Sequence, residues 1–153
     1  MLKRSTSIFL AASLAAAGLA YASPSSKEAA ITKHVEGENF KLDTSAGDCK
    51  VGAECTATIK IEAKGEFHIN KEFPYKLEMA DAEGVEFSGG KVFSKANGNF
   101  SAQEKTAEMK IKFKASKAGD LTLKGTYKLT VCTDKNCPPP VSQEIAVELK
   151  IKK

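Results

Sequence analysis

This sequence of 153 residues has few histidines, nearly balanced charge and only one long apolar run. Its two histidines limit both acid–base catalysis and metal binding. The formal net charge is +4, and lysines alternate with acidic residues instead of gathering in a basic patch, which argues against a dedicated nucleic-acid binder. The chain also lacks a Ser/His/Asp motif, a paired-carboxylate signature and a phosphate-binding glycine loop. These absences argue against a hydrolase or a nucleotide-dependent enzyme.

The one long apolar run lies near the N-terminus. Lys3 and Arg4 precede the apolar residues 8–19, and Ala20-Tyr21-Ala22 resembles a cleavage site. This order predicts a secretory signal peptide over residues 1–22. The run is about twelve residues long, whereas a membrane-spanning helix needs about 20, and no cysteine marks a lipoprotein site. We therefore expect a periplasmic or secreted protein, cleaved near Ala22, without a stable membrane anchor.

The remaining chain is long enough for one domain, since single cores usually span about 100–200 residues. Residues 23–38 show no apolar period and are rich in small and charged side chains, so we expect a flexible tether there. Residues 39–153 are expected to form the folded domain.

Strict alternation of apolar and polar side chains dominates that domain. It extends over residues 55–64, 107–115, 121–131 and 144–152, and shorter candidates lie at 40–42, 67–69, 75–79 and 85–87. Alternation with a period of two is typical of half-buried strands, and glycine-containing turns separate the segments. The pattern predicts an all-β, immunoglobulin-like antiparallel β-sandwich of seven or eight strands.

The folded part contains all four cysteines, Cys49, Cys55, Cys132 and Cys137. An even number in an exported chain favours disulfides over free thiols. Three pairings are possible, and we expect Cys49–Cys55 and Cys132–Cys137 because each pair is close in sequence and flanks turn-forming residues. Neither spacing is the C-x2-C of structural zinc sites, so no metal site is expected.

The second pair occupies a predicted hairpin tip, with Cys132 at the end of a strand and Cys137 followed by three prolines. Cys132 shares the parity of the polar side chains Lys128 and Thr130, so we expect it near the surface. A disulfide exposed at a loop tip is open to attack by a thiolate. The alternative is a structural staple, since closing so short a loop stabilises a fold by roughly 2–2.5 kcal/mol. The residues alone leave both interpretations open.

The element Cys132-x4-Cys137-Pro-Pro follows an alternating strand and precedes a C-terminal strand. Together with the upstream segments 65–70, 73–77 and 84–87, it resembles the N-terminal periplasmic domain of the DsbD thiol:disulfide interchange reductase family, also called the disulfide bond corrector domain. The resemblance covers roughly residues 40–151. That family has an immunoglobulin-like sandwich fold.

The resemblance implies a thiol:disulfide oxidoreductase domain that passes electrons to other exported proteins without a cofactor. By analogy, Cys137 forms the mixed disulfide with the partner and Cys132 resolves it, while Phe93 in the loop 88–93 caps the pair. In that family, further domains supply the electrons, so we expect a separate electron donor, such as a membrane protein. Nucleic acid is not an expected partner.

Cys49 and Cys55 have no known role in that family, and we expect a structural disulfide; the rival interpretation is a second redox pair or a bridge that exchanges with the Cys132–Cys137 pair. His68 should point outward or toward a neighbouring loop. The alternative for the whole protein is a disulfide-stapled, secreted β-sandwich that acts as a binding or structural module without redox turnover.

Overall fold

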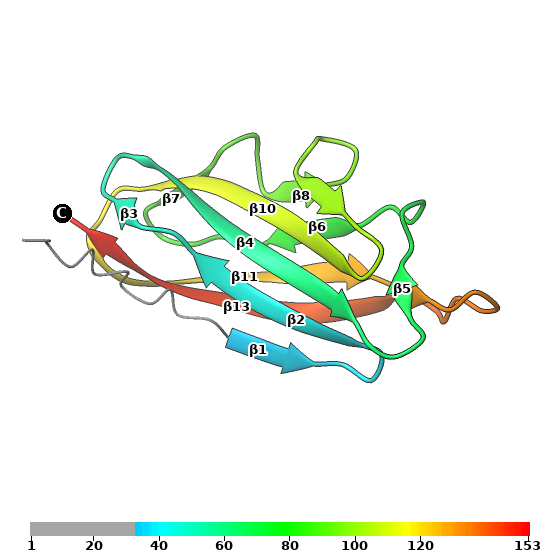
Figure 1. Ribbon diagram of the computed structural model, residues 1–153. Helices are drawn as coiled ribbons and strands as arrows, with labels where there is room; N and C mark the ends of the chain where they lie inside the picture. The colour runs from blue at the N-terminus through cyan, green and yellow to red at the C-terminus, as the bar shows by residue number, and fades with distance from the viewer. Residues whose placement is uncertain (1–32) are drawn as a thin grey trace, which may run out of the picture.

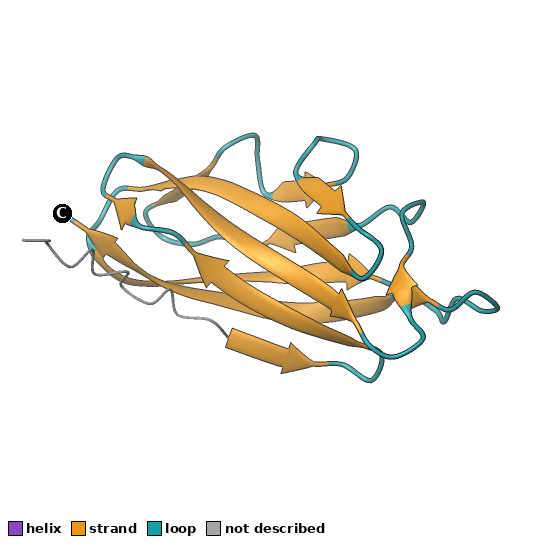
Figure 2. Cartoon of the chain, viewed as in Figure 1, coloured by secondary structure: helices purple, strands orange, loops and turns teal. Residues whose placement is uncertain are grey.

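The computed structural model describes residues 33–153, which form an all-β domain of thirteen strand segments (Figures 1 and 2). The described residues contain no helix. The strands form two large sheets packed face to face and a separate two-stranded pair. The predicted all-β sandwich is therefore confirmed.

The first sheet has the strand order β1-β2-β4-β10-β7, and β9 pairs with β10 as well. Its members are β1 (Lys33–Glu36), β2 (Phe40–Ala46), β4 (Glu54–Ala63), β7 (Val85–Phe87), β9 (Phe100–Ala102) and β10 (Thr106–Ala115). All of its strand pairs are antiparallel.

The second sheet has the order β3-β13-β11-β6-β8. Its members are β3 (Cys49–Lys50), β6 (Lys76–Met79), β8 (Val92–Ser94), β11 (Gly119–Leu129) and β13 (Val141–Lys152). Only β3 runs parallel to its neighbour β13. The separate pair joins β5 (His68–Ile69) to β12 (Val131–Cys132), antiparallel, at one end of the sandwich.

The core lies between the two sheets and follows the alternation of the sequence. In β4 and β10 the apolar residues face inward, and Ile59, Ile61, Met109, Ile111 and Phe113 are fully buried. The apolar side chains of β11 and β13 cover them from the other sheet. Each fully buried side chain of this size stabilises the fold by about 1.5–3 kcal/mol, so the two long strand pairs supply most of the hydrophobic stabilisation.

Two expectations about the architecture need correction. The expected seven or eight strands are too few, because segments of two or three residues such as β3 and β12 are too short to show alternation. The expected tether 23–38 is also too long, since β1 pairs with β2 over residues 33–36. Val35 packs against the core and His34 contacts the Asp43 carboxylate across the pair, which explains why so polar a segment joins the sheet. Residues 1–32, with the predicted signal peptide and the first part of the tether, lie outside the described residues.

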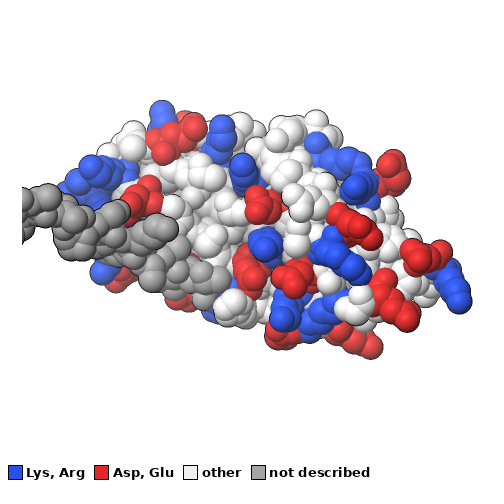
Figure 3. All heavy atoms as spheres, in the orientation of Figure 1, with Lys and Arg blue, Asp and Glu red and all other residues white. Residues whose placement is uncertain are grey.

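Acidic and basic side chains are interleaved on the face shown in Figure 3. The interleaving leaves that face without an extended region of one sign. Ion pairs also join strands of the described domain, including Lys33 with Glu148 at 3.6 Å and Lys112 with Glu54 at 3.8 Å. Exposed pairs of this kind contribute little to stability, typically about 0–1 kcal/mol.

The two cysteine pairs lie at opposite ends of this sandwich (Figure 1). β3 lies beside the C-terminal end of β13, whereas β5 and the loop that follows β12 protrude from the other end.

Candidate functional site

Both predicted cysteine pairings are confirmed. The Cα atoms are 5.2 Å apart in the Cys49–Cys55 disulfide and 4.3 Å apart in the Cys132–Cys137 disulfide. The protein is therefore a β-sandwich with two disulfides, each closing a short loop. Such bonds fit an oxidising compartment outside the cytoplasm.

The Cys49–Cys55 disulfide connects the two sheets. Cys49 belongs to β3 in the second sheet, Cys55 belongs to β4 in the first, and both are buried within the core. The loop between them is bound to both layers, since the Gly52 amide donates to the Ala115 carbonyl and the Val51 amide donates to the Lys152 carbonyl. Burial and cross-sheet position fit the expected structural disulfide.

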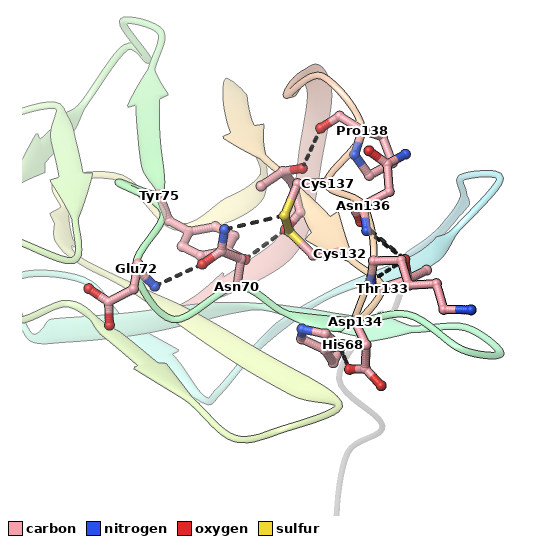
Figure 4. Close-up of a disulfide and its surroundings, with 12 residues drawn as sticks. His68, Asn70, Glu72, Tyr75, Cys132, Thr133, Asp134, Asn136, Cys137 and Pro138 are labelled. Atoms are coloured by element: carbon pink, nitrogen blue, oxygen red, sulfur yellow. Dashed lines mark hydrogen bonds and ion pairs between the residues drawn. A yellow bond between two sulfur atoms is a disulfide. The ribbon is translucent and has the colours of Figure 1, made fainter.

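The Cys132–Cys137 disulfide closes the protruding loop (Figure 4). Within this loop, the Thr133 amide donates to the Asn136 carbonyl at 2.8 Å, and the Thr133 hydroxyl accepts from the Asn136 amide at 3.1 Å. These hydrogen bonds form a compact turn in which residues 134–137 are exposed. The loop thus presents Cys137 at the surface.

Cys132 lies in the opposite environment, with an exposed fraction of only 2%. The expectation that it approaches the surface is therefore wrong. The parity argument assumes one continuous strand, but β11 ends at Leu129 and β12 pairs with β5 instead of with the second sheet. Because the chain changes sheets at Thr130, four consecutive residues, 129–132, are buried.

Hydrogen bonds fix the base of the loop on both sides. The Thr130 hydroxyl donates to the Pro138 carbonyl at 3.1 Å, which ties the residues before and after the disulfide together. The buried Tyr75 hydroxyl donates to the Thr130 carbonyl at 2.7 Å. Burial raises the pKa of Tyr75 to about 12, so its hydroxyl remains a donor throughout the physiological pH range.

An aromatic cluster supports that hydroxyl. The Tyr75 ring stacks on Phe100 at a centroid distance of 4.4 Å and contacts the edge of Phe73 at 5.1 Å. The neighbouring Tyr127 is fully buried, and burial raises its pKa above the ordinary range. The loop with the exposed cysteine is therefore attached to the core through a buried tyrosine that packs among other aromatic rings.

Two residues from the segment after β4 approach the loop. The Asn70 side-chain amide donates to the Cys137 sulfur at an Nδ2–Sγ distance of 3.8 Å, and His68 Nδ1 lies 3.7 Å from the Asp134 carboxylate (Figure 4). His68 thus points toward a neighbouring loop, which is one of the two orientations expected for it. Asn70 carries no signal in the sequence beyond its place after a short strand.

Phe93 does not lie over the disulfide. It is a core residue of β8 with 1% exposure, opposite Leu77 in β6, and its ring contacts Phe87 edge-on. Phe93 therefore does not act as a cap in this structure, because the alternation of β8 turns its side chain inward. The side chain that contacts Cys137 comes instead from the turn that begins at Asn70.

Among residues 33–153, no three His, Cys, Asp or Glu side chains come together in a way that suits a metal ion. The same part of the chain holds no helix of sufficient length and apolar character to cross a membrane.

Comparison with known proteins leaves the family open. No protein-family model matches the chain, and no curated protein matches it.

Proposed function

We propose that this protein is an exported thiol–disulfide interchange domain that passes electrons to partner disulfides through Cys132 and Cys137. The observation that carries the proposal is the unequal exposure of the two cysteines: Cys137 is exposed, whereas Cys132 is 2% exposed. Thiol–disulfide exchange needs one sulfur that a partner can reach and a second that attacks after the partner is bound. The resemblance of the Cys132-x4-Cys137-Pro-Pro element to the DsbD N-terminal domain supports the same assignment.

The reaction begins with the reduced pair. The Cys137 thiolate attacks one sulfur of a partner disulfide, and the other partner sulfur leaves as a thiolate. The Cys132 thiolate then attacks the Cys137 sulfur, which releases the second partner thiolate and forms the Cys132–Cys137 disulfide. The partner gains two electrons and this domain loses two. A separate protein dithiol must reduce the Cys132–Cys137 disulfide before the next cycle.

The geometry supports this order of attack. Cys137 lies in the exposed part of the loop, and Pro138 behind it has no N–H and restricts the backbone of Cys137 to extended conformations. Cys132 is held by its pairing with β5 and by its burial, and its Cα atom lies 4.3 Å from that of Cys137. It is therefore close enough to attack the Cys137 sulfur and resolve the mixed disulfide. Cys49 and Cys55 are both buried, and they offer a partner no comparable access.

A redox titration of the purified protein in thiol buffers, quenched by alkylation and read for each cysteine by peptide mass spectrometry, tests the proposal. We expect a reduction potential well above about −300 mV for Cys132–Cys137, because structural disulfides have potentials below that value. The Cys49–Cys55 pair in the same sample is the internal control and should remain oxidised. A Cys132–Cys137 potential below about −300 mV would instead identify a binding or structural module without redox turnover.

A pair of single variants tests the order of attack with glutathione disulfide as the probe. After reduction, Cys132→Ser should accumulate a mixed disulfide between Cys137 and glutathione, because the resolving thiolate is missing. The matched Cys137→Ser variant should react more slowly, since its remaining thiol is buried. Equal rates for the two variants would contradict the assigned roles.

A further inference from the structure

Asn70 is the first residue of a turn that follows β5. Its side-chain Oδ1 accepts a hydrogen bond from the Glu72 amide at 3.0 Å, and its backbone carbonyl accepts one from the Phe73 amide at 3.2 Å. This is an Asx-turn, in which the side chain bonds its own backbone two residues on. Because Oδ1 is occupied by the Glu72 amide, the orientation of the side-chain amide is fixed, and the NH2 group faces the disulfide loop.

The Asn70 NH2 group points at the sulfur of Cys137, with 3.8 Å between Nδ2 and Sγ (Figure 4). The turn and the loop share one framework, since β5 pairs with β12 and places His68 opposite Cys132. The Ile69 amide also donates to the Glu104 carbonyl at 2.8 Å, which ties β5 to the segment before β10. The donor is thus positioned before any reaction begins.

The charged groups around the loop largely offset one another. Asp134 and Lys135 are neighbours within it, Lys71 and Glu72 are neighbours in the turn, and His68 on β5 faces Asp134. Because positive and negative side chains are both present around the loop, their effects on the Cys137 thiolate oppose one another. A hydrogen-bond donor in contact with the sulfur then contributes strongly to the stability of the thiolate. A thiolate accepts such a bond more strongly than a disulfide sulfur does, because hydrogen bonds to ionised acceptors are roughly twice as strong.

We infer that the Asn70 side-chain amide stabilises the Cys137 thiolate and thereby makes Cys137 the attacking cysteine. This inference rests on the proposed function, because it assigns a role within the same exchange site. Asn70 contacts the reacting sulfur directly, and no bond to Asn70 forms or breaks during exchange. A donor to the ionised form lowers the pKa of a thiol.

The test compares Asn70→Asp with Asn70→Ser, because both replacements keep an oxygen that can accept from the Glu72 amide and preserve the turn. In Asn70→Asp, the second carboxylate oxygen replaces the donor beside Cys137. In Asn70→Ser, the shorter side chain no longer reaches the sulfur. The measurement is the alkylation rate of Cys137 in the fully reduced loop as a function of pH, read by peptide mass spectrometry, which gives the thiol pKa.

We expect the pKa of Cys137 to rise by about half a unit in Asn70→Ser and by about one unit in Asn70→Asp. Alkylation at pH 7 should then be roughly threefold and tenfold slower, respectively. A merely structural role for Asn70 predicts an unchanged pKa in Asn70→Ser, because that variant keeps the turn and adds no charge. An unchanged pKa in Asn70→Ser would overturn the inference even if Asn70→Asp shifts, since the shift would then reflect only the added charge.

Asn97→Asp is the matched control for that charge. Asn97 also accepts from a backbone amide, that of Ser94 at 2.8 Å, as well as from the Ser94 hydroxyl. Its other hydrogen bonds are with Val92 of β8 and with Asn99 in the β8–β9 connection. Its substitution should leave the pKa of Cys137 unchanged, and an equal shift in both Asp variants would also overturn the inference. The thiol pKa is measured on the reduced protein whatever its potential, so failure of this inference and failure of the proposed function give different results.

Discussion

The two disulfides close loops of almost the same length, with sequence separations of six and five residues. In the chain-entropy model, each closure contributes about 2 kcal/mol, so loop entropy does not distinguish them. Their surroundings do. Cys49–Cys55 is buried and joins the two sheets, whereas Cys132–Cys137 joins a buried residue to an exposed one within a single loop. Accessibility, rather than spacing, is therefore what distinguishes the two disulfides in this structure.

The largest expected difference between the two disulfides is their rate of reduction. In the native protein, dithiothreitol should reduce Cys132–Cys137 about a thousandfold faster than Cys49–Cys55. The reason is that a reductant reaches the buried pair only after the two sheets open locally. We expect the free energy of that opening to be about 4 kcal/mol, which corresponds to a thousandfold difference in rate. Quenched alkylation over time, read for each cysteine, measures both rates.

Urea at a concentration that unfolds the protein provides the control. The two rates should then agree within about tenfold, since both pairs are equally accessible in the unfolded chain. Reduction of Cys49–Cys55 at the same rate as Cys132–Cys137 in the folded protein would remove the distinction on which the comparison rests.

A second expected difference concerns stability. Replacing Cys49 and Cys55 together by alanine should lower the free energy of unfolding by about 4 kcal/mol, because the loss of packing in the core adds to the loss of the cross-link. Replacing Cys132 and Cys137 together should cost only about 2 kcal/mol, since one of the two sulfurs lies at the surface. Urea denaturation followed by circular dichroism measures both values. Equal losses would show that the exposed disulfide is as important for stability as the buried one.

The smallest expected effect is a pH dependence at the Cys132 end of the sandwich. Burial raises the pKa of Tyr75 from 10.0 to about 12, so the folded state favours the protonated hydroxyl that donates to Thr130. This contribution to stability is complete below pH 10 and is lost as the pH rises from 10 toward 12. Between pH 10 and 11 the loss should be about 1 kcal/mol for Tyr75. Urea denaturation at several pH values measures the slope.

Tyr75→Phe is the control for that slope. It should cost about 1 kcal/mol at pH 8, because the Thr130 carbonyl loses its donor, and it should reduce the alkaline slope. Some slope should remain, since Tyr127 is also buried and burial raises its pKa as well. An unchanged slope in Tyr75→Phe would mean that Tyr75 does not titrate as its buried position requires.

Much of the fold could be predicted because long strands repeat the same signal many times. In β4, five alternate residues from Cys55 to Ala63 are apolar, and all five are buried in the structure. The cysteine pairings could also be predicted from the sequence, since each pair lies across one short turn. The short strands β3 and β12 were not predictable, because two residues cannot display a period and their partners lie far away in the sequence.

The errors at the candidate site have three separate origins. The surface position expected for Cys132 followed from extending the alternation of β11 through Thr130, where the chain in fact leaves its sheet for β5. The cap expected at Phe93 followed from analogy, and the inward side of β8 buries that side chain instead. Asn70 was missed because its contact with Cys137 joins residues 67 positions apart.

The sequence by itself determined the class of the fold, the inner faces of its long strands and the two disulfide pairings, because all of these depend on neighbours within a few residues. Only the tertiary structure decided that Cys137 alone among the four cysteines is exposed. Burial depends on how strands from distant parts of the chain pack, and the exposed fraction of Cys132 was set by the change of partner from β11's sheet to β5. The chemistry available to the two disulfides therefore depends on packing that their spacing does not encode.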